Sequence, residues 1–267
     1  MKIITLIENL VESQELVAEH GLSLYFDTGD RKILFDTGQS GLFMQNAQKL
    51  GIDIGEIDTV ILSHGHYDHT GGLYPFLKAN KKAKVYAKKE VFLPKYKGKT
   101  RFIGTIFNEE AFSDRLIYVN AITEVAPEVF ILPNIELRHD IDINFIHHFK
   151  KEGTSFCPDT FEDELFLVIR KNKHINILTA CSHRGITNIC ETASSVFKLP
   201  INLILGGFHM SDCGIGQYVH ITHYLRALHP KLIGVCHCTG VNKFSEMINE
   251  CDSKVFYNCT GNEVTCS

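Results

Sequence analysis

The run Ser63-His64-Gly65-His66-Tyr67-Asp68-His69-Thr70-Gly71-Gly72 contains four side chains of metal-ligand type within six residues. It follows Thr59-Val60-Ile61-Leu62, a short apolar segment typical of a buried strand. Side chains two positions apart point the same way in an extended chain, so His64 and His66 can bind one ion. The aspartate and the last histidine follow on the turn into a helix, where they can bind a second ion. Surface histidines in a polar loop are the alternative, but the buried strand and the paired glycines favour a metal site.

Further ligands are expected from other strand ends, because a catalytic ion usually has three protein ligands and an open position. In α/β proteins, binding sites gather at the carboxyl ends of strands. We predict that His183 and His237 are metal ligands and that His209 contacts the substrate. The apolar segments before these histidines are Ile175–Thr179 before His183, Ile201–Leu205 before His209 and Leu232–Cys236 before His237.

Asp36 also ends an apolar segment, in Ile33-Leu34-Phe35-Asp36-Thr37-Gly38. We predict that its carboxylate orients a ligand imidazole or a loop amide without binding metal itself. An Asx-type turn leading into Gly38 is the alternative. His20 is expected at the surface, with a position lining the pocket as the alternative. The other histidines, including His148, have no second ligand near them in the sequence and are given no role.

The remaining pattern indicates an α/β fold with two strand-rich halves, each followed by helices. Such a pattern predicts two sheets packed face to face with helices outside, in a single domain spanning residues 1–267. Thr70 is the expected N-cap of the helix at 71–79. Residues 88–156 show no clear pattern apart from a short strand at 115–119. The predicted strands are 22–26, 32–35, 59–62, 84–87, 115–119, 165–170, 175–179, 201–205 and 232–236, and the predicted helices are 41–50, 71–79, 187–198, 216–228 and 241–250.

The composition is that of a soluble globular protein, with 44% hydrophobic and 22% charged residues among 267. The net charge of −4 gives no bulk attraction to nucleic acid or to an anionic membrane. The clusters Lys81-Lys82 and Lys95 to Lys99 are expected to be solvated surface rather than phosphate-binding patches. The expected partner is therefore a small-molecule substrate, and a homo-oligomer is left open.

The chain is expected to be cytoplasmic, since it shows neither a signal peptide nor a run of about 18 apolar residues. The nine cysteines are an odd number, which a complete disulfide framework cannot use. They also lack the repeated CxxC spacing of a zinc ribbon. Reduced thiols are expected.

Taken together, these motifs resemble those of the metallo-beta-lactamase fold hydrolase superfamily. Phe35-Asp36-Thr37-Gly38 matches its first motif, the HxHxDH run at 64–69 matches its signature, and His237 matches its final ligand histidine. The resemblance implies a four-layer αββα sandwich. It also implies two divalent metal ions in a groove at one edge, expected to be zinc, with manganese and iron as alternatives.

The sequence departs from the commoner branches of that superfamily, which carry a ligand histidine before a later strand and a bridging aspartate after it. Here the strand ends in Cys181-Ser182-His183, and no clear histidine precedes Asp163-Glu164-Leu165. What bridges the ions is left open. Together with His20-Gly21-Leu22-Ser23 and Cys236-His237-Cys238-Thr239-Gly240, this variant resembles a narrower branch, the dihydropterin-linked ribofuranosylaminobenzene phosphate synthases of methanopterin biosynthesis.

The predicted activity is hydrolysis of an ester, phosphoester or related small molecule by a metal-bound hydroxide. Bound metal lowers the pKa of water from about 16 to about 7. Asp68 is the predicted catalytic residue, because it can also accept the proton of the attacking water. The predicted ligands are His64, His66 and His183 for one ion and Asp68, His69 and His237 for the other, with His183 as a candidate shared ligand.

Two other functions are compatible with the sequence. One is a condensing, transferase-type reaction on a pterin and a ribosyl phosphate, with Lys88, Lys89 or Arg184 holding the phosphate. The other is a non-catalytic metal or ligand sensor, which would bind metal without turning over any ester.

Overall fold

Two seven-stranded sheets form the centre of the computed structural model, which describes residues 1–112 and 114–266. The first sheet contains, in spatial order, β18 (Glu263–Thr265), β1 (Lys2–Ile7), β2 (Ser23–Asp27), β3 (Lys32–Phe35), β4 (Thr59–Ile61), β5 (Lys84–Ala87) and β8 (Leu116–Tyr118). The second contains β17 (Lys254–Tyr257), β16 (Leu232–Val235), β15 (Ile201–Gly206), β14 (His174–Leu178), β13 (Phe166–Lys171), β10 (Val129–Leu132) and β9 (Thr123–Ala126).

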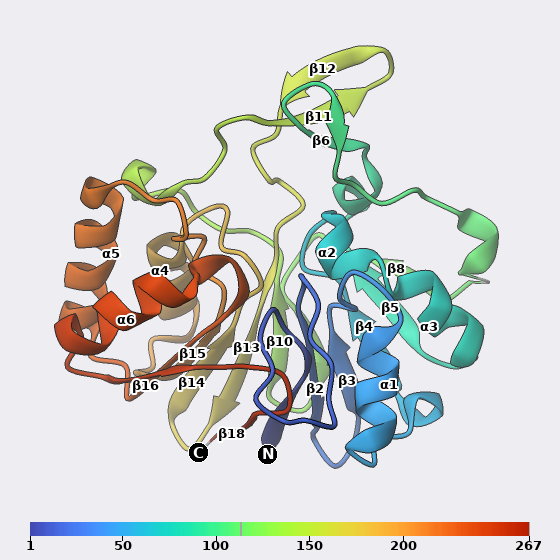
Figure 1. The fold of residues 1–267 in the computed structure, drawn as a ribbon, viewed down its shortest axis with the longest axis horizontal. Coiled ribbons are helices and arrows are strands. Elements are labelled where there is room, and N and C mark those ends of the chain that lie inside the picture. The colour runs from blue at the N-terminus through green and yellow to red at the C-terminus, as the bar shows by residue number, and fades with distance from the viewer. Residues whose placement is uncertain (113, 267) are drawn as a thin grey trace.

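Helices cover the outer face of each sheet (Figure 1). The first sheet is covered by α1 (Leu42–Lys49) and α3 (Leu73–Ala79), and the second by α4 (Ile186–Phe197), α5 (Ile215–Leu228) and α6 (Val241–Glu250). The four layers confirm the predicted αββα sandwich. No helix in the described part of the chain is long and apolar enough to cross a membrane.

Strand side chains alternate between two apolar cores, because successive residues of a strand point to opposite faces. In β2, Leu24 and Phe26 pack between the sheets, whereas Tyr25 packs under α1 and α3. In β13, Leu167 packs between the sheets and Val168 packs under the helices of the second sheet. Burial on both faces explains why the strands are nearly continuous apolar runs.

A third, four-stranded sheet stands above the sandwich in Figure 1 and is built from the middle of the chain. Its short strands are polar and form two local hairpins, which are joined by a long-range pairing such as that of Tyr96 with Phe149. The sequence pattern therefore did not predict it. Its strands in spatial order are β12 (Ser155–Pro158), β11 (His148–Glu152), β6 (Lys95–Lys97) and β7 (Arg101–Phe102).

The predicted helices and strands agree with the structure to within about two residues, with one correction at the turn after the histidine run. Thr70 is not a helix N-cap. It is the last residue of α2 (Tyr67–Thr70), and its hydroxyl donates to the carbonyl of His66. Gly72 stands at the start of α3 instead. The strands β1, β9, β10, β17 and β18 were not predicted either.

Candidate metal centre

The predicted first set of ligands meets at the edge of the sandwich, below the third sheet. His64 and His66 follow β4, and His183 follows β14 in the other sheet. The ring centroids lie 4.7 Å apart for His64 and His66 and 4.9 Å apart for His66 and His183. One ring nitrogen from each residue lies within 4.8 Å of the other two. The three imidazoles can therefore bind one cation.

The predicted second set also converges. His69 Nε2 lies 3.2 Å from His237 Nε2, and Asp68 Oδ2 lies 3.3 Å from His237 Nε2 and 3.9 Å from His69 Nε2. Ligand atoms about 2.1 Å from a tetrahedral cation are roughly 3.4 Å apart. The three side chains thus have the spacing of a second metal site beside the first.

Two cysteines without a predicted metal-site role also carry donor atoms here. Cys181 Sγ lies 3.2 Å from His69 Nε2. It also lies within 4.8 Å of a ring nitrogen of His64, His183 and His209. Cys238 follows His237 along the chain, and its sulfur lies within 4.8 Å of donor atoms of Cys181 and His237. Each cysteine lies within two residues of a predicted ligand, and the sequence could have suggested a role on that ground.

His20 is exposed, as expected, but it also lines the cavity, which was the alternative. Its Nε2 lies 3.2 Å from Asp68 Oδ2, and its ring lies 4.9 Å from that of His237. Gly21 brings it close: a Cβ at Gly21 would lie only 2.4 Å from the carbonyl oxygen of Asp68. His20 belongs to a loop without regular periodicity, so its position in the sequence did not predict its contact with Asp68.

The first set fits a cation in its hydrogen bonding as well as its spacing. His64 Nε2, His66 Nε2 and both ring nitrogens of His183 are buried and have no hydrogen-bond partner in the described part of the chain. Buried polar atoms without partners are rare and costly. Burial also lowers the pKa of all three histidines well below the usual value, which keeps the rings neutral, as metal ligands must be.

The second set lies in a negative field. Burial by itself would lower the pKa of His69, but Asp68 and Asp36 outweigh it and raise that pKa to about 9. For Asp68, burial is likewise outweighed, by the imidazoles of His69, His20 and His237, and its pKa stays well below the usual value. The same carboxylates that favour a proton on His69 favour a metal cation there.

Asp36 connects two parts of the site. It has a left-handed backbone conformation with φ 61° at the end of β3. Its Oδ2 lies 2.8 Å from His69 Nδ1 and accepts a 2.6 Å hydrogen bond from the Ser63 hydroxyl. Ser63 Oγ in turn lies 2.8 Å from His64 Nδ1. Asp36 thus contacts a predicted ligand and leaves His69 Nε2 facing the site.

Buried carboxylates of neighbouring loops bind the backbone amides of His183 and His237, the predicted ligands from the second sheet. Glu164 accepts 2.7 Å hydrogen bonds from the amides of His183 and Arg184, and burial raises its pKa to about 7. The His183 ring stacks on Phe161 at a centroid distance of 3.8 Å. Glu8 accepts the amide proton of His237 at 2.5 Å.

Gly65 is required by its close neighbours. A Cβ there would lie 2.1 Å from the carbonyl oxygen of Val91. Its amide donates to Asp163 Oδ2 at 2.7 Å, and Asp163 also accepts from the buried Lys95 Nζ at 2.9 Å. Asp163 therefore links the third sheet to the turn between the two predicted ligand histidines.

A cavity of about 370 Å³ opens over the site. His209, the predicted substrate contact, lines it beside His183, with their ring centroids 4.4 Å apart. His148 lines it too, although the sequence gave it no role. Its ring lies 5.6 Å from that of His66, and burial lowers its pKa to about 4. Lys97 and Arg101 complete the cationic side of the mouth.

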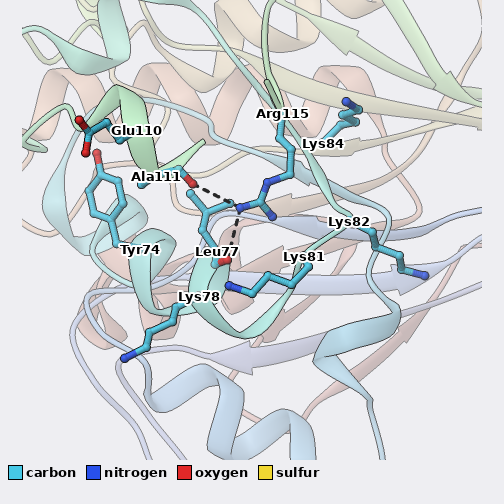
Figure 2. Close-up of a pocket in the computed structure, with 9 residues that line it drawn as sticks. All are labelled: Tyr74, Leu77, Lys78, Lys81, Lys82, Lys84, Glu110, Ala111 and Arg115. Carbon is cyan, nitrogen blue, oxygen red and sulfur yellow. Dashed lines mark hydrogen bonds between the residues drawn. The ribbon is translucent and has the colours of Figure 1, made fainter. Parts of the chain in front are cut away.

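Other cavities contain basic residues but no convergent ligands among the described residues. Figure 2 shows one of them, of about 510 Å³, where Lys78, Lys82 and Lys84 point in different directions. Arg115 there donates to backbone carbonyls at the end of α3 and after it, a structural role. Another, of about 200 Å³, is lined by Lys88 and Arg184, two of the suggested phosphate ligands.

Comparisons with known proteins agree with this geometry. Residues 17–151 match the family model described as the metallo-beta-lactamase superfamily. The chain is 30% identical to the 7,8-dihydropterin-6-methyl-4-(beta-D-ribofuranosyl)-aminobenzene-5'-phosphate synthase of Methanocaldococcus jannaschii, over 94% of this chain and 92% of the relative.

Solved structures give the same result. A crystal structure described as a metal-dependent hydrolase of the beta-lactamase superfamily superposes with a TM-score of 0.89 at 31% identity, covering 100% of this chain and 99% of the other. The metallo-beta-lactamase fold protein YhfI from Bacillus subtilis shares the fold, with a TM-score of 0.60 at 16% identity and 98% coverage of both chains. The ligand geometry, the family model and the full-length relatives agree: this chain belongs to the metallo-beta-lactamase superfamily.

Proposed function

We propose that this protein is a metal-dependent hydrolase of a small ester, phosphoester or related substrate. The observation that carries the proposal is the convergence of two sets of donor atoms, one with unpartnered buried imidazole nitrogens, at the base of a cavity of about 370 Å³. The similar solved structure described as a metal-dependent hydrolase supports it. The nine free thiols support a reducing compartment such as the cytoplasm.

Each set of donors would hold one divalent cation, with zinc proposed and manganese or iron as alternatives. Divalent cations in such a site supply Lewis acidity, which activates water and polarises a substrate oxygen. Cys181 lies within 4.8 Å of donor atoms of both sets, and we propose its sulfur as a further donor. Burial raises the pKa of its thiol, so a bound cation would have to stabilise the thiolate. The proposed ligands are His64, His66 and His183 for one cation and Asp68, His69 and His237 for the other.

Asp68 is the proposed proton acceptor. Its carboxylate is buried, ionised over the neutral range because the surrounding imidazoles lower its pKa, and lines the cavity. His20 and His237 fix its Oδ2 at 3.2 and 3.3 Å, respectively. A carboxylate fixed in this way can take the proton from water as the water attacks the substrate.

The test begins with elemental analysis of the purified protein, followed by a panel of phosphodiesters, lactones and thioesters with the metal found. Asp68→Asn keeps the size of the side chain and should lower kcat by about 10²–10⁴-fold on the substrate identified. Asp212→Asn is the matched control, because Asp212 lines the same cavity outside both ligand sets. Full activity of metal-loaded Asp68→Asn would remove Asp68 from the mechanism.

A condensing reaction is the second candidate, favoured by the 30% identity to a relative named as a synthase. The same metal-loaded protein assayed with a pterin diphosphate analogue and an aromatic amine separates the two. Product formation there, without hydrolysis of any ester, would favour condensation. Bound metal without turnover in either assay would instead support a sensor.

A further inference from the structure

Two cations face each other at the mouth of the metal cavity. Lys97 ends β6 and Arg101 begins β7, and the two residues are directly paired in the antiparallel register. Directly opposed residues of an antiparallel pair have Cβ atoms about 5 Å apart on one face of the sheet. Both side chains line the cavity that contains Asp68 and His66. Like charges in this arrangement repel each other, so the pair destabilises the hairpin that carries it.

In the described part of the chain, no carboxylate forms an ion pair with either residue. Arg101 has a single weak hydrogen bond, at 3.5 Å, to the hydroxyl of Tyr67. Other lysines of the same sheet are paired: Lys95 with Asp159 at 2.6 Å, and Lys150 with Glu162 at 2.6 Å. Lys99 and Lys151 also form no ion pair in the described part of the chain, but their ammonium groups lie over the rings of Phe149 and Phe156. Lys97 and Arg101 are exposed and line the cavity without an acidic partner.

We propose that Lys97 and Arg101 form a binding subsite for a phosphate-type dianion on the substrate. The guanidinium of Arg101 can hold two oxygens in a fork, and the ammonium of Lys97 can hold a third as a point charge. A dianion also balances the two opposed cations, whereas a carboxylate balances only one. The cavity volume of about 370 Å³ suits a small molecule that reaches from this rim to the ligand sets.

The buried Lys95 corrects the expectation that Lys95 to Lys99 are all solvated surface, whereas Lys97 is exposed as expected. Lys95 is buried in its ion pairs, and Lys97 lines the cavity. The proposed subsite replaces the suggestion that Lys88 and Arg184 hold phosphate. Those two side chains donate to the carbonyls of Pro133 and Thr160, respectively, and line a different cavity. The inference rests on the proposed function only for the reaction of the substrate at the two ligand sets, not for the binding of its dianion.

The experiment measures equilibrium binding of three aromatic probes to the metal-loaded protein by calorimetry. Phenylphosphonate carries a dianion that cannot be hydrolysed as an ester, benzoate carries one charge, and benzyl alcohol carries none. The double variant K97M/R101M should bind phenylphosphonate at least tenfold more weakly than the wild type. Lys99→Met is the matched control on the same hairpin, since Lys99 lies outside the cavity lining, and it should leave the affinity unchanged.

Two results would overturn the proposal: equal phenylphosphonate affinity in the wild type and K97M/R101M at equal metal content, or benzoate binding to the wild type as tightly as phenylphosphonate. Neither depends on turnover. A failure to hydrolyse esters would contradict the proposed function and leave this binding result intact, whereas normal ester hydrolysis with unchanged phosphonate affinity would contradict only the subsite.

Discussion

Asp36 is one buried carboxylate that connects both sets of predicted metal ligands. It lies at the end of a strand and accepts hydrogen bonds from the amide and hydroxyl of Ser63 at 2.7 and 2.6 Å while contacting His69 Nδ1. The contact fixes which nitrogen of His69 faces the site. A carboxylate behind a ligand imidazole also makes that imidazole a better donor.

Asp36→Asn should therefore weaken metal binding without unfolding the protein. The amide keeps an acceptor oxygen for Ser63 but removes the charge beside His69, and loss of such a partner typically costs 10–100-fold in metal affinity. Competition with a chelator measures the change, with the exposed Asp30→Asn as control. Unchanged affinity in Asp36→Asn would show that its role is confined to the turn.

At the residue scale, the residues that sequence reasoning predicted as ligands from local patterns do converge in the structure. The run at 64–69 is contiguous, and His183 and His237 each follow an apolar strand, so the topology brings them to one edge. His148 and His20 reach the cavity through tertiary packing of the third sheet and of an irregular loop. No spacing in the sequence encodes those approaches.

At the element scale, Lys95 fixes the third sheet to the sandwich. Its ammonium is 1% exposed and bonds to Asp159 and Asp163, and Asp163 also holds the amide of Gly65. Lys95→Met would leave two buried carboxylates side by side without a cation. Breaking a buried ion pair in this way typically costs about 3–5 kcal/mol.

Urea unfolding of Lys95→Met should show that loss in the free energy of unfolding, together with weaker metal binding because the Gly65 turn is released. The exposed Lys99→Met, from the same hairpin, should differ from the wild type by less than about 0.5 kcal/mol. Similar stabilities for the two variants would mean that the sheet is held by its other contacts.

The elements that the sequence predicted best are those buried on both faces, such as β13 and β14, because continuous apolar runs and flanking turns mark them. The strands of the third sheet are two to five residues long and rich in lysine. The pairing that joins its two hairpins spans about fifty residues, as between Tyr96 and Phe149. Local patterns cannot reveal strands that depend on such distant partners.

At the scale of the whole molecule, the segment that connects β10 of the second sheet to β11 of the third sheet contains a buried acid, Asp142. Asp142 accepts 2.8 Å hydrogen bonds from the amide and hydroxyl of Thr187 in the first turn of α4. Its other oxygen is buried without a partner in the described part of the chain. Burial raises its pKa to about 6, against about 4 in an unfolded chain.

A raised carboxyl pKa means that the folded protein binds more protons than the unfolded chain between about pH 4 and pH 6. The stability contributed by the protonated form is thus present at low pH and is lost as the pH rises through 6. Asp142→Asn cannot ionise, so it should gain stability relative to the wild type by up to about 3 kcal/mol between pH 4 and pH 7. Urea unfolding of both proteins across this range measures the difference, with Asp30→Asn as the exposed control. A difference that stays constant with pH would show that Asp142 ionises as easily in the folded protein as in the unfolded chain.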